Sequence, residues 1–324
     1  MLVLNLGTPD GTDYWSMRRY LSEFLSDKRV IDWPAAVWQP ILQGIILSIR
    51  PGKKGKDYET IWNKERNEGP LLTITRSQAE KLANVLAPVS DRIVVDFAMR
   101  YGNPATGPAI DKLLQQGCER ILLLPMYPQY SVATSATAAD KAFQHLMGME
   151  RQPAIRVTPP WHDDPVYIDA LAMSVRHHLA TLDFEPDMLL ASFHGVPQRY
   201  LLKGDPYHCH CVKTARLLRE TLGWPKERFT QTFQSRFGPE PWLQPYTDKT
   251  VEALAKSGTK RLVMIAPGFS ADCLETLEEL DVENREIFLH NGGEKFSYIP
   301  CLNDSDLGIK VMTAVALREL GGWI

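Results

Sequence analysis

The sequence lacks the features that mark several large classes of protein. Its 324 residues carry a formal net charge of −3, so no broad basic field is available to attract nucleic acid. No apolar run reaches the roughly 18–20 residues that span a bilayer. The turn-forming stretch 7–11 ends the first apolar run too early for a secretory signal. The five cysteines are irregularly spaced, which gives no disulfide framework and favours a reducing, cytoplasmic setting.

Common catalytic and anchoring signatures are absent too. There is no Walker A sequence and no Gly-x-Gly-x-x-Gly, so nucleotide chemistry has no support, and no Gly-x-Ser-x-Gly of a serine hydrolase. The most apolar segment, 37–49, is too short to span a membrane, and we expect Pro40 to break its start. Basic residues follow it, so we weigh two alternatives for 37–54: a helix packed on the core, or an interfacial helix at a membrane surface.

An alternation of strand and helix patterns is what the sequence does contain. Apolar runs rich in β-branched residues predict eight strands, near 1–6, 92–98, 120–125, 154–158, 188–193, 229–234, 260–266 and 296–300. Helical patterns between them include 77–86, 107–116, 165–182, 211–221 and 248–257. This order predicts an α/β protein with two Rossmann-like domains, each a parallel four-stranded sheet flanked by helices.

The two halves resemble each other. Segment 4–9 parallels 192–197, 100–104 parallels 236–239, and 117–122 parallels 258–263, in the same order in each half. We therefore expect two copies of one α/β unit, one in each half of the chain. Ligands of such sheets bind outside the carboxyl ends of the strands, so we expect a cleft between the two copies.

Differences between the copies locate the expected chemistry. At matched positions the first half has Leu6, Ser131 and Thr134, and the second has His194, Asp272 and Glu275. His194 directly follows the predicted strand 188–193, and the turn formed by Gly195 and Pro197 would push its ring towards the cleft. A lone histidine is usually structural, but this position favours a functional one.

The segment 267–280 supplies the carboxylates. At about 100° per residue, an α-helix there would place Asp272, Glu275 and Glu279 on one face. A solvated acidic face at a helix start is the ordinary explanation; the functional one is a row of carboxylates that attracts a cation or relays protons. With His194, these groups suit an exchangeable Fe²⁺, Co²⁺ or Zn²⁺, for which His194 and Glu275 are the candidate ligands.

Aromatic residues follow the predicted strand ends, where they would line an apolar cleft or simply join the core. They are Tyr101, Tyr127, Tyr130, Trp242 and Phe269. The run His-Cys-His-Cys at 208–211 contains four potential metal ligands. Neighbouring side chains in an extended segment point to opposite sides, however, so we interpret the run as structural or incidental. The alternative is an iron–sulfur site completed by Cys273 or Cys301.

Several segments together resemble the signatures of the ferrochelatase family. They are Ser-Phe-His-Gly-Val-Pro at 192–197, Gly-Asp-Pro-Tyr at 204–207, Gly-Pro-Glu-Pro-Trp-Leu at 238–243 and Glu-Thr-Leu-Glu-Glu-Leu at 275–280, with Leu-Asn-Leu-Gly at 4–7 and Tyr-Pro-Gln-Tyr-Ser at 127–131. The resemblance runs on to 298–303, essentially the whole chain. It implies two Rossmann-like domains around a porphyrin cleft, with a C-terminal helix that returns to the first domain. We therefore expect a first domain of 1–145 plus 303–324 and a second of 146–302.

The resemblance also implies roles for individual residues. His194 would accept a pyrrole proton or bind iron, Glu275 would be the opposed metal ligand or proton relay, and Asp272 and Glu279 would form an acidic path beside it. Porphyrin contacts would come from Phe269 and Trp242, and a polar pair in the pocket from Arg100 and Tyr101.

Two departures from family patterns refine the expected substrate and cofactor. Leu6 stands where family members that metallate coproporphyrin carry tyrosine, which favours protoporphyrin IX as substrate. Val132 stands where the animal enzymes have a cluster-binding cysteine, which excludes an animal-type [2Fe-2S] cluster and leaves a differently ligated one open. No cofactor would be required, and Fe²⁺ would be a substrate.

The resulting hypothesis is insertion of Fe²⁺ into protoporphyrin IX to form protohaem, the terminal step of haem biosynthesis. The enzyme would bend the macrocycle and remove its pyrrole protons. Trp33, Trp38 and the segment 37–54 would form an apolar lip that touches the inner membrane peripherally. The alternatives are a cobalt chelatase for another tetrapyrrole and a non-enzymatic porphyrin or haem carrier.

Overall fold

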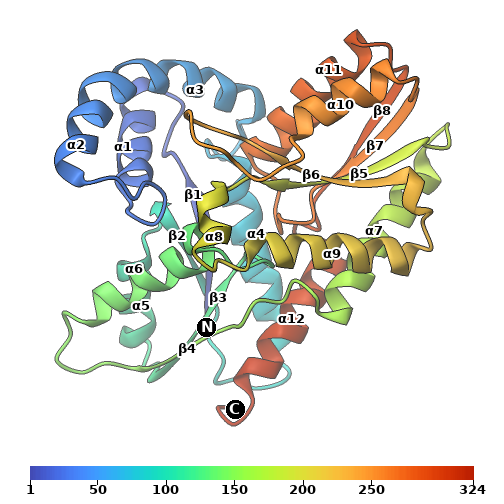
Figure 1. Ribbon diagram of the computed structural model, residues 1–324. Helices are drawn as coiled ribbons and strands as arrows, with labels where there is room; N and C mark the ends of the chain where they lie inside the picture. Colours follow the sequence, from blue (N-terminus) through green and yellow to red (C-terminus); the bar gives the residue numbers. More distant parts are fainter. The chain divides into compact units, whose positions relative to one another are not determined.

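Eight strands form two four-stranded parallel sheets in the computed structural model, which describes residues 1–324 (Figure 1). The strand order is β2-β1-β3-β4 in the first sheet and β6-β5-β7-β8 in the second. All eight predicted strands are present, although β2 begins four residues later than expected. The predicted fold class, α/β with two parallel four-stranded sheets, is confirmed.

The chain divides into two compact units. The first comprises Met1–Tyr127, Ser131–Pro159 and Met312–Ile324, and the second comprises Pro128–Tyr130 and Pro160–Val311. The domain ranges expected from the sequence place both boundaries earlier, after residues 145 and 302, whereas the compact units change after residues 159 and 311. The assignment of the expected ranges to functional domains stays a prediction.

The first unit is a sheet with helices on both faces. Its elements are β1 (Leu2–Thr8), α1 (Tyr14–Leu25), α2 (Ala35–Ile41), a π-helix η1 (Leu42–Ile46), α3 (Leu47–Ile61), α4 (Pro70–Leu86), β2 (Asp96–Gly102), α5 (Thr106–Gln115), β3 (Arg120–Pro125), a π-helix η2 (Val132–Ala136), α6 (Thr137–Leu146) and β4 (Ala154–Val157). Because side chains alternate along a strand, Leu2 and Leu4 share one face of the sheet. There they pack against the buried residues of α5 and α6. On β1, Asn5 donates instead to Thr75 of α4 at 3.0 Å.

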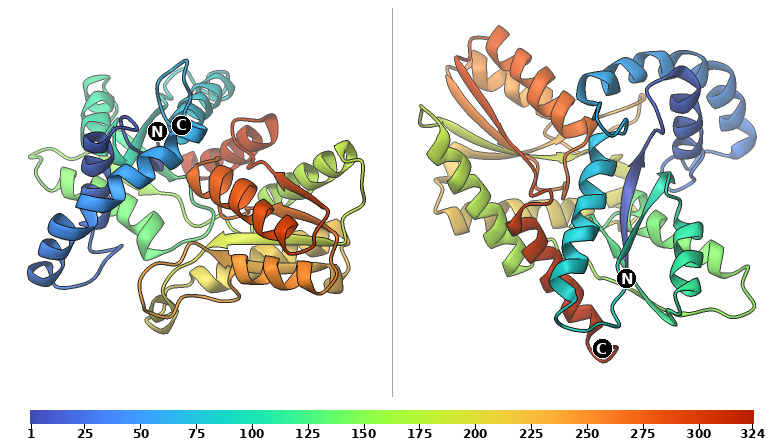
Figure 2. Two further views of the ribbon diagram at one scale, coloured as in Figure 1. Left: turned by 90° about the horizontal axis from the view of Figure 1, so that it is seen from above. Right: turned by 180° about the vertical axis from the view of Figure 1, so that it is seen from behind.

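The second unit repeats this plan. Its elements are α7 (Pro165–Thr181), β5 (Met188–His194), α8 (Gln198–Leu202), α9 (Tyr207–Leu222), a 3₁₀-helix η3 (Lys226–Arg228), β6 (Phe229–Gln234), α10 (Thr247–Lys256), β7 (Arg261–Ile265), a π-helix η4 (Glu275–Glu283), α11 (Asn284–His290) and β8 (Lys295–Ile299), followed by α12 (Asp306–Leu320), which passes into the first unit. A core with Leu190, Leu262 and Met264 joins the sheet to α10, α11 and η4. Figure 2 shows α10 and α11 in orange on one face of these strands.

The C-terminal residues dock on the edge strand of the first unit. The guanidinium of Arg156, in β4, donates to Gly321 O at 3.2 Å and lies 4.3 Å from the centre of the Trp323 ring. Arg120, which opens β3, donates to Trp323 O at 3.3 Å. These contacts fix the last turn beyond α12 to the first sheet.

The segment 37–54 is one succession of helices, α2, η1 and α3. Pro40 lies inside α2, so the expectation that it breaks the segment's start is wrong: the helix continues into the π-helical turn Leu42–Ile46. One face packs on the unit, with Leu42 and Leu47 fully buried, while Ile45 and Ile49 are 59 % and 70 % exposed. Both alternatives weighed for this segment therefore keep a physical basis.

Trp38 does not join the exposed face, since it is buried and its indole N–H donates to Leu25 O at 2.6 Å. Trp33 is exposed. No helix of the structure combines the length and the hydropathy needed to cross a bilayer.

The sheet register corrects one of the three internal matches. Beside Leu6, the neighbouring residue on β2 is Arg100, and beside His194 the neighbouring residue on β6 is Gln234. If Leu6 corresponds to His194, then Gln234, and not Arg236, is the counterpart of Arg100. The sequence match between 100–104 and 236–239 rested on a similar turn sequence. It is shifted by two residues from the correspondence that the strand pairing gives.

Candidate functional site

His194 ends β5 at the carboxyl edge of the second sheet, and its ring is held in one tautomer. Its Nδ1 lies 2.6 Å from Gly195 O. Because a carbonyl oxygen only accepts, Nδ1 carries the proton and a neutral ring keeps a free lone pair on Nε2. The hydroxyl of Tyr207 donates to His194 O at 2.9 Å and fixes the backbone beneath the ring.

Two of the predicted aromatic residues lie near His194. The Phe269 ring centre is 6.5 Å from the imidazole centre. Trp242 packs against Gly195, where an added Cβ would come within 3.3 Å of the indole and 2.8 Å of Gln234 O. The indole N–H of Trp242 donates to Phe237 O at 2.9 Å. Glycine at 195 therefore lets the proline-stiffened loop close over the strand end.

Glu275 and Glu279 belong to the nine-residue π-helix η4, and this differs from the expected α-helix. A π-helix bonds residue i to i+5 and is wound wider than an α-helix, so the assumed 100° per residue does not apply. Ser235, at the end of β6, donates to the Glu279 carboxylate. Burial raises the pKa of Glu279, and the Glu275 and Glu283 charges raise it further. The Ser235 hydrogen bond and a positive charge on His194 oppose this rise.

Asp272 stands apart from these two glutamates. It precedes the helix, is buried, and its carboxylate accepts from Thr276 at 2.9 Å, Tyr298 at 2.9 Å and Asn303 at 2.6 Å. The backbone N–H of Cys301 adds a contact at 3.2 Å. The expected single face of three carboxylates is therefore wrong in this respect, because the acceptor capacity of Asp272 is used in joining η4 to the loop after β8.

Gln234 and Ser235 were missed by sequence reasoning, yet they connect the imidazole strand to the acidic helix. Gln234 lies beside His194 in the sheet, accepts from Ser192 at 2.8 Å and donates to Glu275 O at 2.7 Å. Ser235 has a positive φ of 60°, unusual for serine. The only sequence signal was their position at the end of β6, beside the strand that carries His194.

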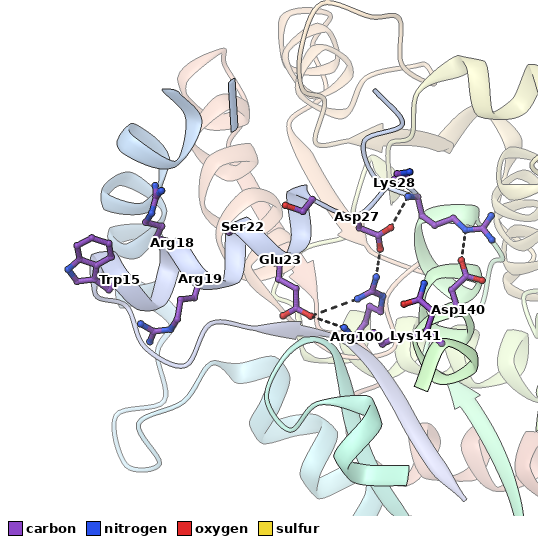
Figure 3. A pocket seen from close by; sticks show the side chains of 13 residues that line it. Trp15, Arg18, Arg19, Ser22, Glu23, Asp27, Lys28, Arg100, Asp140 and Lys141 are labelled. Atoms are coloured by element: carbon purple, nitrogen blue, oxygen red, sulfur yellow. Dashed lines mark hydrogen bonds and ion pairs between the residues drawn. The ribbon is translucent and has the colours of Figure 1, made fainter. Parts of the chain in front are cut away.

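Arg100 lies in a charged network of the first unit (Figure 3), and the Tyr101 hydroxyl joins this network through Asp27. Arg100 donates to Asp27 at 2.5 Å and to Thr137 at 2.7 Å, and the Tyr101 hydroxyl donates to Asp27 at 2.7 Å. Tyr101 is completely buried. Its predicted contact with a porphyrin ring is not tested by this burial and stays a prediction. Arg100, Asp27 and Glu23 line a hollow of about 960 Å³ whose rim carries further basic side chains.

The remaining predicted contact residues differ in surroundings. Leu6 is half-buried at the end of β1. Tyr127 packs against the core of the first unit. Tyr130 is half-buried and belongs to the second unit, where its N–H donates to Nδ1 of His210 at 3.3 Å.

The His-Cys-His-Cys run opens α9, and its members scatter as expected of a helix. His208 stacks on Phe233, Cys209 is exposed, His210 stacks on His162 and Cys211 is fully buried. No three His, Cys, Asp or Glu side chains of the structure gather in a way that could hold a metal ion. Burial raises the pKa of the Cys211, Cys273 and Cys301 thiols, which disfavours the thiolate that a cluster needs.

Comparison with known proteins decides the family. The family model described as ferrochelatase matches residues 1–320. This chain belongs to the ferrochelatase family. Curated relatives named ferrochelatase include those of Agrobacterium fabrum, 64 % identical over all of this chain and 94 % of the relative, and Rhizobium meliloti, 61 % identical over all of this chain and 95 % of the relative. Ferrochelatases are metal chelatases, so the expectation of an enzyme of this class is confirmed.

Solved structures agree on the fold at low sequence identity. SirB from Bacillus subtilis with Fe³⁺ matches with a TM-score of 0.52 and 13 % identity, over 76 % of this chain and 90 % of that one. DR2241 from Deinococcus radiodurans, described as similar to chelatases, matches with a TM-score of 0.50 and 15 % identity, over 76 % of this chain and 51 % of that one. This chain thus has a chelatase-like fold.

Proposed function

We propose that this ferrochelatase inserts Fe²⁺ into protoporphyrin IX to form protohaem, the terminal step of haem biosynthesis. The observation that carries the mechanism is the tautomer of His194, whose Nδ1–H is used by Gly195 O and whose Nε2 is left as a base. Membership of the family supplies the reaction, and the second unit supplies a base, two neighbouring carboxylates and apolar rings in one region.

Metal insertion requires that the two pyrrole N–H protons leave as the nitrogens bond to the metal. In this mechanism His194 Nε2 takes the two protons one after the other, becomes an imidazolium each time, and passes each proton on towards Glu279. Glu279 suits the onward relay, because a carboxyl whose pKa is raised by burial can hold a proton closer to neutral pH than a solvated one. Glu275, whose charge acts on Glu279 and whose backbone is fixed by Gln234, is the proposed metal ligand. Because Nδ1 of His194 carries a proton, Nε2 can bind the metal beside Glu275 only while the ring is neutral.

Contacts with the porphyrin ring are proposed for apolar or aromatic residues that are not packed entirely into the core. Phe269 and Trp242 flank His194 in the second unit, Tyr130 extends from the same unit, and Leu6 ends the first strand of the first unit. Leucine at position 6 favours protoporphyrin IX as the substrate. Tyr127 stays a weaker candidate because its ring packs on the core, and Arg100 is proposed to act within its ionic network.

A supporting role is proposed for Asp272, and no iron–sulfur cluster is proposed for the cysteines. Asp272 would support the acidic helix through its hydrogen bonds to Thr276 and Asn303. Fe²⁺ would be a substrate, and no resident cofactor is proposed. A visible absorption spectrum of the purified protein tests the latter, since a [2Fe-2S] cluster would give bands that reduction bleaches.

Peripheral membrane contact at the cytoplasmic side of the inner membrane is proposed for 37–54. Its support is the apolar exposed surface of Val37, Ile45 and Ile49, followed by exposed Lys53 and Lys56. Such a surface, apolar beside basic, suits an anionic lipid interface. Protoporphyrin itself partitions into lipid, so the contact would shorten its path to the enzyme.

The decisive experiment compares metal insertion by the wild type with that by His194→Ala and Glu275→Gln. We expect His194→Ala to lose insertion of Fe²⁺ and Zn²⁺ by at least about a hundredfold, within the range for a general base, while protoporphyrin still binds. Glu275→Gln should lower kcat by about tenfold or more. His177→Ala is the matched control, because His177 is an exposed histidine of α7. Full turnover by His194→Ala would remove the proposed base.

Metal and ring competition separates the alternatives. A cobalt chelatase would prefer Co²⁺ and a more polar tetrapyrrole, and a carrier would bind porphyrin with no spectral change on addition of any metal. The carboxylate pair beside His194 gives no advantage to a carrier, because haem binding alone requires no proton acceptor at that place.

A further inference from the structure

Two histidines that the proposed reaction does not use stack on each other in the second unit. The rings of His162 and His210 have centres 3.7 Å apart and planes 10° apart. His162 lies just before α7 and is 9 % exposed, and its Nδ1 is buried without a hydrogen-bond partner. Rings stacked face to face hold their nitrogens in parallel planes, so the two lone pairs cannot converge on one metal ion.

His210 accepts a hydrogen bond from the backbone of Tyr130. The Tyr130 N–H lies 3.3 Å from His210 Nδ1, and because an N–H only donates, this nitrogen must carry a lone pair. Burial lowers the pKa of His210, and burial together with the His210 charge lowers that of His162 to about 4. The pair is therefore neutral at pH 7, which is the state that this hydrogen bond requires.

Other charged groups around the pair oppose each other. Asp163 raises the pKa of both rings and Asp205 raises that of His210, whereas Lys213 lowers both. Lys213 and Asp163 form an ion pair at 2.5 Å. Acidification would therefore charge His210 before His162. Protonation would change His210 Nδ1 from an acceptor into a donor, which cannot pair with the Tyr130 N–H.

Tyr130 belongs to a three-residue segment, Pro128–Tyr130, that the second unit holds at several points. Gln129 donates to Thr214 at 3.0 Å and to Pro267 O at 3.1 Å. The Thr214 hydroxyl in turn lies 2.7 Å from the carbonyl oxygen of His162 and 3.0 Å from that of His210. The histidine pair and the segment are thus parts of one hydrogen-bonded assembly, and the contact with His210 Nδ1 is the one that protonation can break.

We propose that His210, supported by its stack on His162, is a positioning residue that fixes the Tyr130 backbone and so directs the Tyr130 side chain to the tetrapyrrole. This inference rests on the proposed function, which gives Tyr130 a contact with the porphyrin. His210 touches neither substrate nor metal in this scheme. Its protonation releases the segment, so porphyrin binding weakens in acid through Tyr130.

The test uses the whole 324-residue chain and fluorescence-monitored Zn²⁺ insertion into protoporphyrin IX, with kcat and KM measured from about pH 8 to about pH 5, because the lowered pKa of His210 places its protonation below the usual range of histidine. His210→Phe keeps a ring for stacking and removes the acceptor, whereas His210→Asn places an amide oxygen near the position of Nδ1. We expect His210→Phe to raise the porphyrin KM about three- to tenfold, as for the loss of one hydrogen bond, with kcat within about twofold. His210→Asn should restore the wild-type KM and abolish its rise in acid.

The Tyr130→Ala background shows whether His210 acts through Tyr130. There, His210→Phe should change KM by less than about twofold. Cys209→Ser is the control, because Cys209 is exposed one residue away on α9. The inference fails if His210→Phe leaves KM unchanged, if His210→Asn behaves like His210→Phe, or if the His210→Phe effect persists without the Tyr130 ring.

Other outcomes stay informative. If His210→Phe does not fold, the pH profiles decide: a rise of KM in acid that is absent from Tyr130→Ala supports the inference, and equal rises overturn it. A wild type that binds protoporphyrin without metallating it would refute the proposed function alone. In that case porphyrin affinities from tryptophan fluorescence quenching, with the same variants and the same pattern, decide whether His210 positions Tyr130.

Discussion

Replacement of Asp27 by asparagine should be among the most damaging single changes to the first unit. One carboxylate oxygen of Asp27 accepts from Arg100 at 2.5 Å, from the Tyr101 hydroxyl at 2.7 Å and from Thr137. The side chains of Asp27 and Arg100 are only 8 % and 9 % exposed. Asp27→Asn therefore leaves an almost buried guanidinium without its closest counter-charge.

The expected magnitude follows from these contacts. Removal of one partner of a buried ion pair costs about 3–5 kcal/mol. The asparagine oxygen can still accept from Tyr101 or Thr137, and Glu23 lies 4.0 Å from Arg100, so we expect the lower end, about 3 kcal/mol. For a unit of this size each kcal/mol lowers Tm by about 2–4 °C, which gives a fall of about 6–12 °C.

The same carboxylate predicts a pH dependence with a definite sign. Burial alone would raise the pKa of Asp27, but hydrogen bonds from Thr137, Tyr101 and the Arg29 backbone, with the Arg100 charge, lower it overall. A carboxyl whose pKa is lowered by folding stabilises the fold above its unfolded pKa, near 3.9, and loses that contribution as the pH falls through its folded pKa. The Tm difference between wild type and Asp27→Asn should therefore shrink below about pH 4.

Thermal unfolding by calorimetry measures both effects. Asp140→Asn is the matched control, since Asp140 pairs with Arg29 at 2.7 Å beside the same hollow but both side chains are more than a third exposed. Such a pair contributes less than about 1 kcal/mol. If Asp27→Asn melted within about 1 °C of the wild type, or no lower than Asp140→Asn, the buried network would not have the strength assigned to it.

Three further predictions concern the second unit and the apolar segment. Gln234→Leu removes the hydrogen bond from the β6 end to the η4 backbone and should lower kcat about tenfold, measured by Zn²⁺ insertion, with porphyrin KM little changed. Asn303→Ala removes a 2.6 Å hydrogen bond to Asp272 and should cost about 1.5–3 kcal/mol in urea unfolding; an unchanged midpoint would contradict this. Ile49→Glu should reduce co-sedimentation with anionic vesicles severalfold, whereas Val85→Glu, on α4, should not.

The strands could be predicted because their signal is local. Each strand is a short apolar run bounded by turn residues, and β3 and β6 begin and end at the predicted residues. The α1 helix was not predicted, since its buried side is sparse: Met17, Tyr20 and Leu25 are its large buried residues among polar neighbours. Asp13, which caps it with bonds to two backbone N–H groups, was the available signal.

Site residues could be predicted where their position follows from the end of a single strand. They could not be predicted where their position follows from the register between two strands. His194 follows from its place after β5. Gln234 becomes its neighbour only through the pairing of β5 with β6, a contact across forty residues that no local pattern encodes. The winding of the acidic helix was predicted wrongly for another reason: the sequence 275–283 has ordinary α-helical composition, which gives no sign of its π-helical winding.

The pairing of neighbouring strands suggests why the proposed proton-transfer residues lie in the second copy of the α/β unit. At equivalent sheet positions the first unit has Leu6 beside Arg100, and Asp27 neutralises that guanidinium. The second unit has His194 beside Gln234, whose amide is neutral and is used in hydrogen bonds to Ser192 and the η4 backbone. An arginine at 234 would bring a positive charge to the strand end that joins η4 and would favour ionised carboxylates there, which would oppose the proposed proton relay. A neutral amide joins the strand to the helix while burial keeps the pKa of Glu279 raised, so the same scaffold supports a charge network in one copy and suits the proposed proton transfer in the other.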